Sequence, residues 1–121
     1  MWIRSILPVS LLVASALSLA ACGGDDEGEG GLPACPDGGT ELTYDNFGQA
    51  FFATHCTDCH AAGSGQGEAE SKPFETLADI QADIEEIYAE AGGANDTMPP
   101  GGGPTAEERD KLAEWLSCGA K

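Results

Sequence analysis

The chain has 121 residues, among them 17 glycines and 7 prolines, and its 21 acidic side chains oppose 5 basic ones, for a formal net charge of −16. A chain this short holds one small domain, whose apolar core is marginal without a disulfide or a bound cofactor. The acidic surface excludes nucleic acid and anionic membrane surfaces as binding partners, because both select clustered lysine and arginine.

Residues 1–21 predict a secretory signal peptide of the lipoprotein type. Arg4 is the only charged side chain of this segment, and an apolar run follows from Ile6 to Leu19. A permanent membrane span is the weaker alternative, because a span needs about 20 predominantly apolar residues.

The signal ends in Leu19-Ala20-Ala21-Cys22, which resembles the lipobox of bacterial lipoproteins. That resemblance makes Cys22 the lipidated first residue of the mature protein; the alternative is a chance cysteine after small residues. We therefore expect an exported protein, held by lipid on the periplasmic side of the cell envelope. Gly23 follows the cysteine, and the sorting rule of enteric lipoproteins then favours the outer membrane.

Residues 22–34 predict a lipidated N-terminus and a flexible tether. Residues 23–34 include four acids and five glycines and offer almost nothing to bury. Such a segment spans on the order of 20 Å as a random coil, so it holds the globular domain, residues 35–121, near the membrane.

The first helix of the domain is expected to begin at Thr43, which can act as its N-cap. Apolar residues then recur on one face, at Tyr44, Phe47, Ala50 and Phe51. This helix would end at a pair of cysteines.

That pair lies in Cys56-Thr57-Asp58-Cys59-His60, the C-x-x-C-H pattern of covalent haem attachment. Two thiols three residues apart can each add to a haem vinyl group, and the next residue then presents its imidazole to the iron. The pattern predicts one haem c, attached through Cys56 and Cys59 and ligated by His60.

Two other kinds of site use the same cysteine spacing. A thioredoxin-like redox motif is typical of a βαβ setting, whereas the sequence here is helical and rich in glycine. A structural zinc site needs four thiolate or imidazole ligands, commonly in two separated pairs, and the spacing of Cys35 and Cys118, at the two ends of the domain, is strained for such a cluster. Haem is the favoured interpretation.

A flexible loop is expected at Gly63-Ser64-Gly65-Gln66-Gly67, because it lacks the lysine and the preceding strand of a phosphate-binding loop. A second helix follows from about Thr76 to Glu90. Its apolar face carries Leu77, Ile80, Ile84, Ile87 and Ala91.

Met98 is the expected second axial ligand. It is the only methionine left once the signal is removed, and the other histidine, His55, is adjacent to Cys56 and poorly placed to reach the opposite haem face. Pro99 and Pro100 stiffen the backbone beside it. The alternative is a methionine that packs on the haem without binding iron, which would leave the iron open.

The third helix has the clearest signals. Thr105 and Glu108 form a capping box after Pro104, and Gly119 supplies a stop. Its buried face holds Leu112, Trp115 and Leu116. Because no alternating run long enough for a strand occurs, the domain is predicted to be all-α, with three main helices.

Cys35 and Cys118 remain after the other cysteines are assigned, and in an oxidising compartment they are expected to pair. Two free thiols are the alternative. A loop of about 84 residues closed by a disulfide would stabilise the fold by roughly 4 kcal/mol.

These motifs together resemble the class I cytochrome c family, and in particular its short bacterial one-haem exported members. In that family a glycine and an aromatic residue stand eight and four residues before the first haem cysteine, where the first helix crosses the last. Gly48 and Phe52 stand there in this chain. The resemblance implies that they pack on Leu112 and Trp115, and that Cys35 comes within reach of Cys118.

Two features depart from the family. The proline that usually follows the haem histidine, in the region that supplies a carbonyl to the imidazole, is absent from Ala61-Ala62-Gly63. The hydrogen-bond partner of His60 is therefore unassigned. Many members are also basic around the haem edge, whereas this chain is acidic.

The expected function is that of an electron carrier, not an enzyme: a membrane-tethered cytochrome with redox protein partners that have basic docking surfaces. An acidic coat that serves only solubility is the alternative for the charge. Alternative functions are a haem-based ligand sensor, a haem subunit of a larger dehydrogenase or oxidase complex, and a zinc-stapled surface module. A two-haem peroxidase is disfavoured by the single attachment motif.

Overall fold

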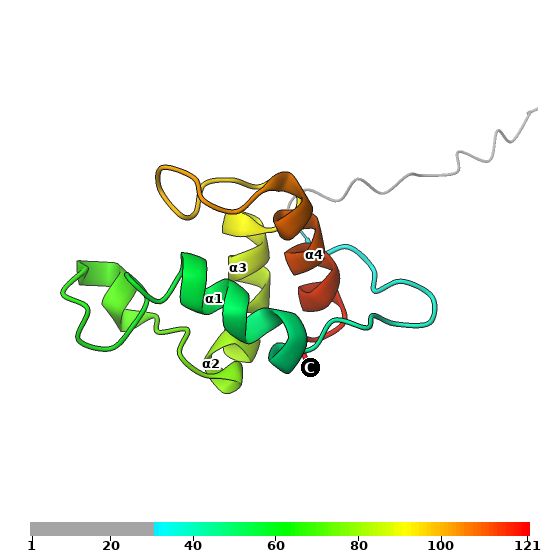
Figure 1. The fold of residues 1–121 in the computed structure, drawn as a ribbon, viewed down its shortest axis with the longest axis horizontal. Coiled ribbons are helices and arrows are strands. Elements are labelled where there is room, and N and C mark those ends of the chain that lie inside the picture. Colours follow the sequence, from blue (N-terminus) through cyan, green and yellow to red (C-terminus); the bar gives the residue numbers. More distant parts are fainter. Residues whose placement is uncertain (1–30) are drawn as a thin grey trace, which may run out of the picture.

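The computed structural model describes residues 31–121, so the predicted signal peptide, Cys22 and most of the tether lie outside the described residues. The regular elements of the described part are all helical, which confirms the predicted fold class (Figure 1). They are the π-helical turn η1 (Tyr44–Gly48), α1 (Gln49–His55), the 3₁₀ turn η2 (Gly67–Ser71), α2 (Leu77–Ala82), α3 (Ile84–Ala91) and α4 (Ala106–Ser117). None of these helices is long and apolar enough to cross a membrane.

The first predicted helix begins where Thr43 caps it. The Thr43 hydroxyl accepts a hydrogen bond from the Asn46 amide, and the Asn46 side chain accepts one from the Thr43 amide. The first turns are wider than an α-helix, because η1 precedes α1 directly. Periodicity predicted the helix but not this widening.

The second predicted helix is divided in two at Asp83. The Thr76 hydroxyl and the Asp79 carboxylate cap the start of α2. Asp83 leaves the helical region at φ −123° and ψ 24°, and α3 begins at the next residue. Aspartate is a weak helix former in a helix interior, and the break still leaves Ile80 and Ile87 buried.

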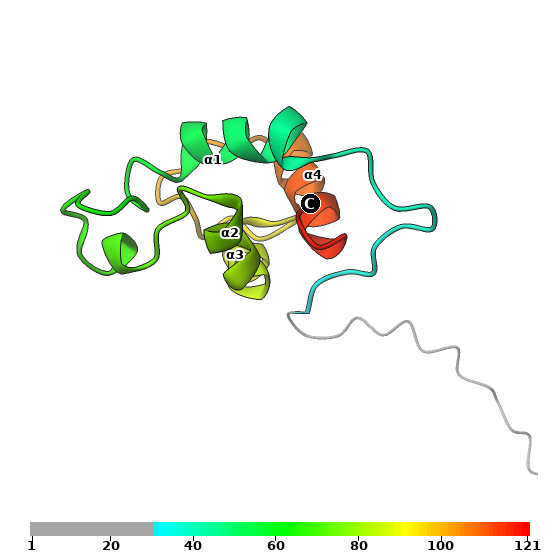
Figure 2. The ribbon, with the colours of Figure 1, turned by 90° about the horizontal axis from the view of Figure 1, so that it is seen from below.

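The helices surround a small aromatic core. Figure 2 shows α1 on one side of the domain, α2 and α3 on the other, and α4 at one end. Five large side chains are fully buried: Trp115, Phe52, Ile80, Leu112 and Leu116. The segment between α1 and α2, which includes η2, extends away at the end opposite α4.

A glycine permits the close approach of the first and last helices. A Cβ atom at Gly48 would lie only 2.5 Å from Cη2 of Trp115. The ring of Phe52 packs on the same indole, with 6.3 Å between the centroids. The helix crossing that the family resemblance implied is therefore present, and Trp115 is its centre.

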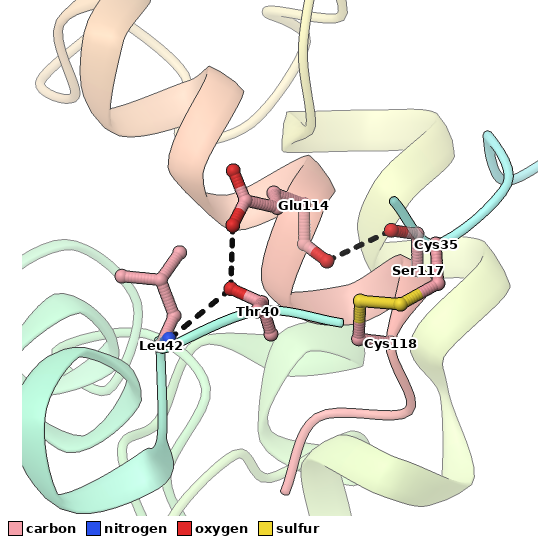
Figure 3. Close-up of a disulfide and its surroundings, with 6 residues drawn as sticks. All are labelled: Cys35, Thr40, Leu42, Glu114, Ser117 and Cys118. Atoms are coloured by element: carbon pink, nitrogen blue, oxygen red, sulfur yellow. Dashed lines mark hydrogen bonds between the residues drawn. A yellow bond between two sulfur atoms is a disulfide. The ribbon is translucent and has the colours of Figure 1, made fainter. Parts of the chain in front are cut away.

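The N-terminal segment is fastened to α4. A disulfide joins Cys35 to Cys118, 83 residues apart (Figure 3). Beside it the Thr40 hydroxyl donates a hydrogen bond to the Glu114 carboxylate, and it accepts one from the Leu42 amide. These contacts bring the two ends of the domain together at the end of α4.

Candidate haem site

A cavity of about 390 Å³ lies between α1, α3 and α4. Its walls are largely apolar and include Phe51, Phe52, Phe74, Ile87, Ala91 and Leu112. Cys56, Cys59, His60 and Met98 line the same cavity. The structure therefore brings together the four residues that the sequence singled out, although His60 and Met98 are 38 positions apart.

A tight turn at the end of α1 arranges the attachment motif. The amide of Cys56 donates to the Phe52 carbonyl over 2.9 Å and so continues the helical pattern. The amides of Cys59 and His60 then both donate to the Cys56 carbonyl, over 3.1 and 2.9 Å. This turn keeps both thiols and the imidazole at the cavity.

Burial keeps the Cys56 sulfur protonated. Desolvation raises the pKa of the Cys56 thiol from 9.0 to about 12, partly opposed by the charge of Arg109. Thiol redox exchange needs a reactive thiolate, so the burial of Cys56 disfavours a thioredoxin-like role. Cys35 and Cys118 are also disulfide-bonded, and the described residues contain no cluster of three or more metal-binding side chains.

His60 is fixed through one ring nitrogen. Its Nδ1 lies 3.0 Å from the Lys72 carbonyl oxygen, and its ring stacks on Phe74 with 4.7 Å between the centroids. The Phe74 amide also donates to the His60 carbonyl over 2.9 Å. With Nδ1–H donating to this carbonyl, Nε2 is the nitrogen available to a metal, and the hydrogen bond makes it a stronger ligand.

The Lys72 carbonyl therefore supplies the partner that the sequence left unassigned. Lys72 precedes Pro73, and a residue before proline is kept out of the helical region; Lys72 lies outside that region, at φ −123° and ψ 73°. Pro73 stands thirteen positions after His60, beyond the segment Ala61-Ala62-Gly63 from which the proline is absent. A search further along the chain for an X-Pro pair could have found this site.

Met98 lies in a segment held by backbone hydrogen bonds. Its amide donates to the Glu90 carbonyl, and its carbonyl accepts from the Arg109 guanidinium, both over 2.8 Å. Met98 is 36% exposed, and among the described residues no other large apolar residue is exposed. A thioether at the mouth of an apolar cavity suits a soft ligand for iron.

His55, the other histidine, also lines the cavity. Its ring packs on Phe51 with 5.0 Å between the centroids, and its Nε2 lies 3.6 Å from a carboxylate oxygen of Glu108. These contacts hold the ring to α1 and α4, so they favour Met98 as the second ligand.

The residues present fit a haem c. Two thiols can form the covalent links, an imidazole and a thioether are the available iron ligands, and apolar side chains cover a flat ring. Lys72, Phe74 and Arg109 are the site residues that sequence analysis missed. For Arg109 a signal existed, since it falls three and seven residues before Leu112 and Leu116 on the buried face of α4.

The chain matches the model of one protein family. Residues 45–116, which contain the attachment motif, Met98 and most of α4, match the family model described as cytochrome C oxidase, cbb3-type, subunit III. No curated protein and no solved structure matches the chain. The chain therefore belongs to this class I cytochrome c-like family, as a haem c protein of electron transfer.

Proposed function

We propose that this chain is a lipid-anchored cytochrome with a single haem, which carries electrons one at a time between redox proteins at the cell envelope. The observation that supports it most directly is the shared cavity: both thiols of the attachment motif, His60 and Met98 line it. The lipobox-like ending at Cys22 supports the anchor and the export.

Haem c supplies an iron that changes between the ferric and ferrous states without rearrangement of bonds. The chain supplies the iron ligands and the apolar surroundings of the haem. The Lys72 carbonyl orients His60, and the Met98 sulfur favours the ferrous state and thereby raises the reduction potential. Apolar side chains such as Phe52 and Leu112 keep water away.

Charge suggests the kind of partner. Residues 31–121 carry 17 acidic and 4 basic side chains, a net charge of −13. Glu86 and Glu90 belong to the residues that line the cavity. A redox partner with a basic docking surface is steered toward such a surface, and salt slows the encounter. A purely solubilising coat predicts electron-transfer rates that do not depend on salt.

A haem subunit of a larger oxidase is the second candidate function, because the matching family is described by an oxidase subunit. A carrier is soluble by itself once the lipid is removed and exchanges electrons with more than one partner. A subunit instead co-purifies with a catalytic chain from native membranes. Purification from native membranes after mild solubilisation separates the two.

The axial ligand is tested by substitution in the haem-loaded protein. Met98→Leu keeps the volume and removes the sulfur, so we expect a lower reduction potential and loss of the weak red charge-transfer band of sulfur-ligated ferric iron. The reduced variant should also bind carbon monoxide. His55→Gln is the control for the other imidazole at the cavity, and it should keep the red band and should not admit carbon monoxide.

Two results would contradict the proposal. An unchanged spectrum in Met98→Leu would exclude Met98 as the ligand. Tight carbon monoxide binding by the native reduced protein would favour a ligand sensor. The anchor is tested separately, because Cys22→Ser should move the cytochrome from the membrane fraction to the soluble periplasmic fraction.

A further inference from the structure

Arg109 is a cation in the core. It is 5% exposed, and no other charged residue in the described part of the chain is buried. Its position in α4 places it on the same face as Leu112 and Leu116. Burial of a charge costs several kcal/mol unless hydrogen bonds or an opposite charge offset the loss of water, so its partners indicate what it does.

Those partners are backbone carbonyls and not carboxylates. Nη1 of Arg109 donates to the carbonyl oxygens of Ala91 and Asn95, each over 3.0 Å, and of Met98 over 2.8 Å. The Arg109 carbonyl accepts from the Gly93 amide over 2.8 Å. One side chain therefore links the end of α3 to the segment that presents Met98.

Within residues 31–121 no carboxylate pairs with this charge. Arg109 takes part in none of the ion pairs among residues 31–121, which are His55 with Glu108, Lys72 with Glu86, and Lys111 with Glu107. Its guanidinium is one hydrogen bond away from Met98, which lines the cavity. A buried positive charge beside a redox centre disfavours the more positive, oxidised state.

We propose that Arg109 is a positioning residue for the second axial ligand: its guanidinium holds the Met98 segment at the cavity, and its buried charge raises the reduction potential of the haem. This inference rests on the proposed function, in which Met98 binds the iron. It adds a residue in the core of α4 that controls both ligand and potential without contact with the iron.

The experiment uses three variants of the haem-loaded protein. Arg109→Gln removes the charge and most of the donors, Arg109→Lys keeps the charge but loses the planar fork, and Lys111→Gln removes an exposed cation from the same helix as the control. We measure the reduction potential, the intensity of the sulfur charge-transfer band, carbon monoxide affinity and the unfolding midpoint.

We expect Arg109→Gln to lower the potential, weaken the band and admit carbon monoxide. Arg109→Lys should recover part of the potential and less of the band, and Lys111→Gln should match the native protein. A merely structural role predicts that Arg109→Gln lowers only the unfolding midpoint, and that result would overturn the proposal.

A measurement on the native protein covers the case in which the variants do not fold. The Arg109 guanidinium protons should exchange slowly with solvent, and their NMR shifts should change between the ferric and ferrous states. Rapid exchange in both states would refute the proposal. If the native protein itself lacks the sulfur band, the assignment of Met98 in the proposed function fails, which is a result distinct from any effect of Arg109.

Discussion

Replacement of Gly48 by alanine tests the packing between the first and last helices. The new Cβ atom would lie 2.5 Å from Cη2 and 2.7 Å from Cζ2 of Trp115. Ordinary carbon contacts are about 3.5 to 4.0 Å, so one of the two groups must retreat by about 1 Å. Trp115 cannot do so easily, because it is fully buried and its Nε1 donates to the Lys121 carbonyl over 3.1 Å.

The magnitude follows from two opposing effects. Forcing an extra carbon into a packed core costs about 3 kcal/mol at the upper end of the usual range. Alanine recovers up to about 1 kcal/mol in a helical position, because it loses less backbone entropy than glycine. We therefore expect Gly48→Ala to lower the free energy of unfolding by about 2 kcal/mol and the melting temperature by roughly 8 to 16 °C.

Denaturant and thermal unfolding of the oxidised, haem-loaded protein measure this loss. The double variant Gly48→Ala with Trp115→Phe is the control, because the smaller ring leaves room for the methyl group. Its cost should be below the sum of the two single costs. If Gly48→Ala is as stable as the native protein, or if the two costs simply add, the proposed helix contact is wrong.

Three further variants test other contacts. Replacement of Cys35 and Cys118 by serine should lower the unfolding free energy by about 4 kcal/mol, because the disulfide joins residues 83 positions apart. Equal denaturant midpoints for the variant and the native protein would contradict this. Hydrogen bonds from the amide and hydroxyl of Thr105 lower the pKa of Glu108. The ionised carboxylate therefore stabilises the fold at pH values above the pKa that Glu108 has in the unfolded chain, and this stability is lost as the pH falls through its pKa in the folded protein. Glu108→Gln should therefore flatten stability against pH on the acid side, and an unchanged slope would refute that role. Thr76→Ala should cost about 1 kcal/mol, because Thr76 caps α2; no change in the urea midpoint would show that the cap contributes nothing.

The residues that attach the haem and bind its iron were predictable from the sequence. The attachment motif needs its cysteines and histidine at that spacing, and Met98 follows from the residues left over. The third helix was also predictable, because Thr105 and Glu108 form its capping box in the structure. These features depend on local chemistry, which a sequence displays directly.

Features that depend on contacts between distant segments were not predictable in the same way. The break at Asp83 does not disturb the apolar period, so periodicity alone gave one helix instead of two. The partner of His60 is a backbone carbonyl, and any residue type can supply one. Arg109 stands where an apolar side chain is the ordinary choice, and only its three carbonyl partners explain it.

Every function proposed above requires a haem bound covalently through Cys56 and Cys59. Mass spectrometry of the protein, produced in cells with haem-attachment machinery and then denatured, tests it most directly. We expect a polypeptide heavier by the mass of one haem, with the added mass on the peptide that contains both cysteines. A colourless protein with the mass of the bare polypeptide would contradict it.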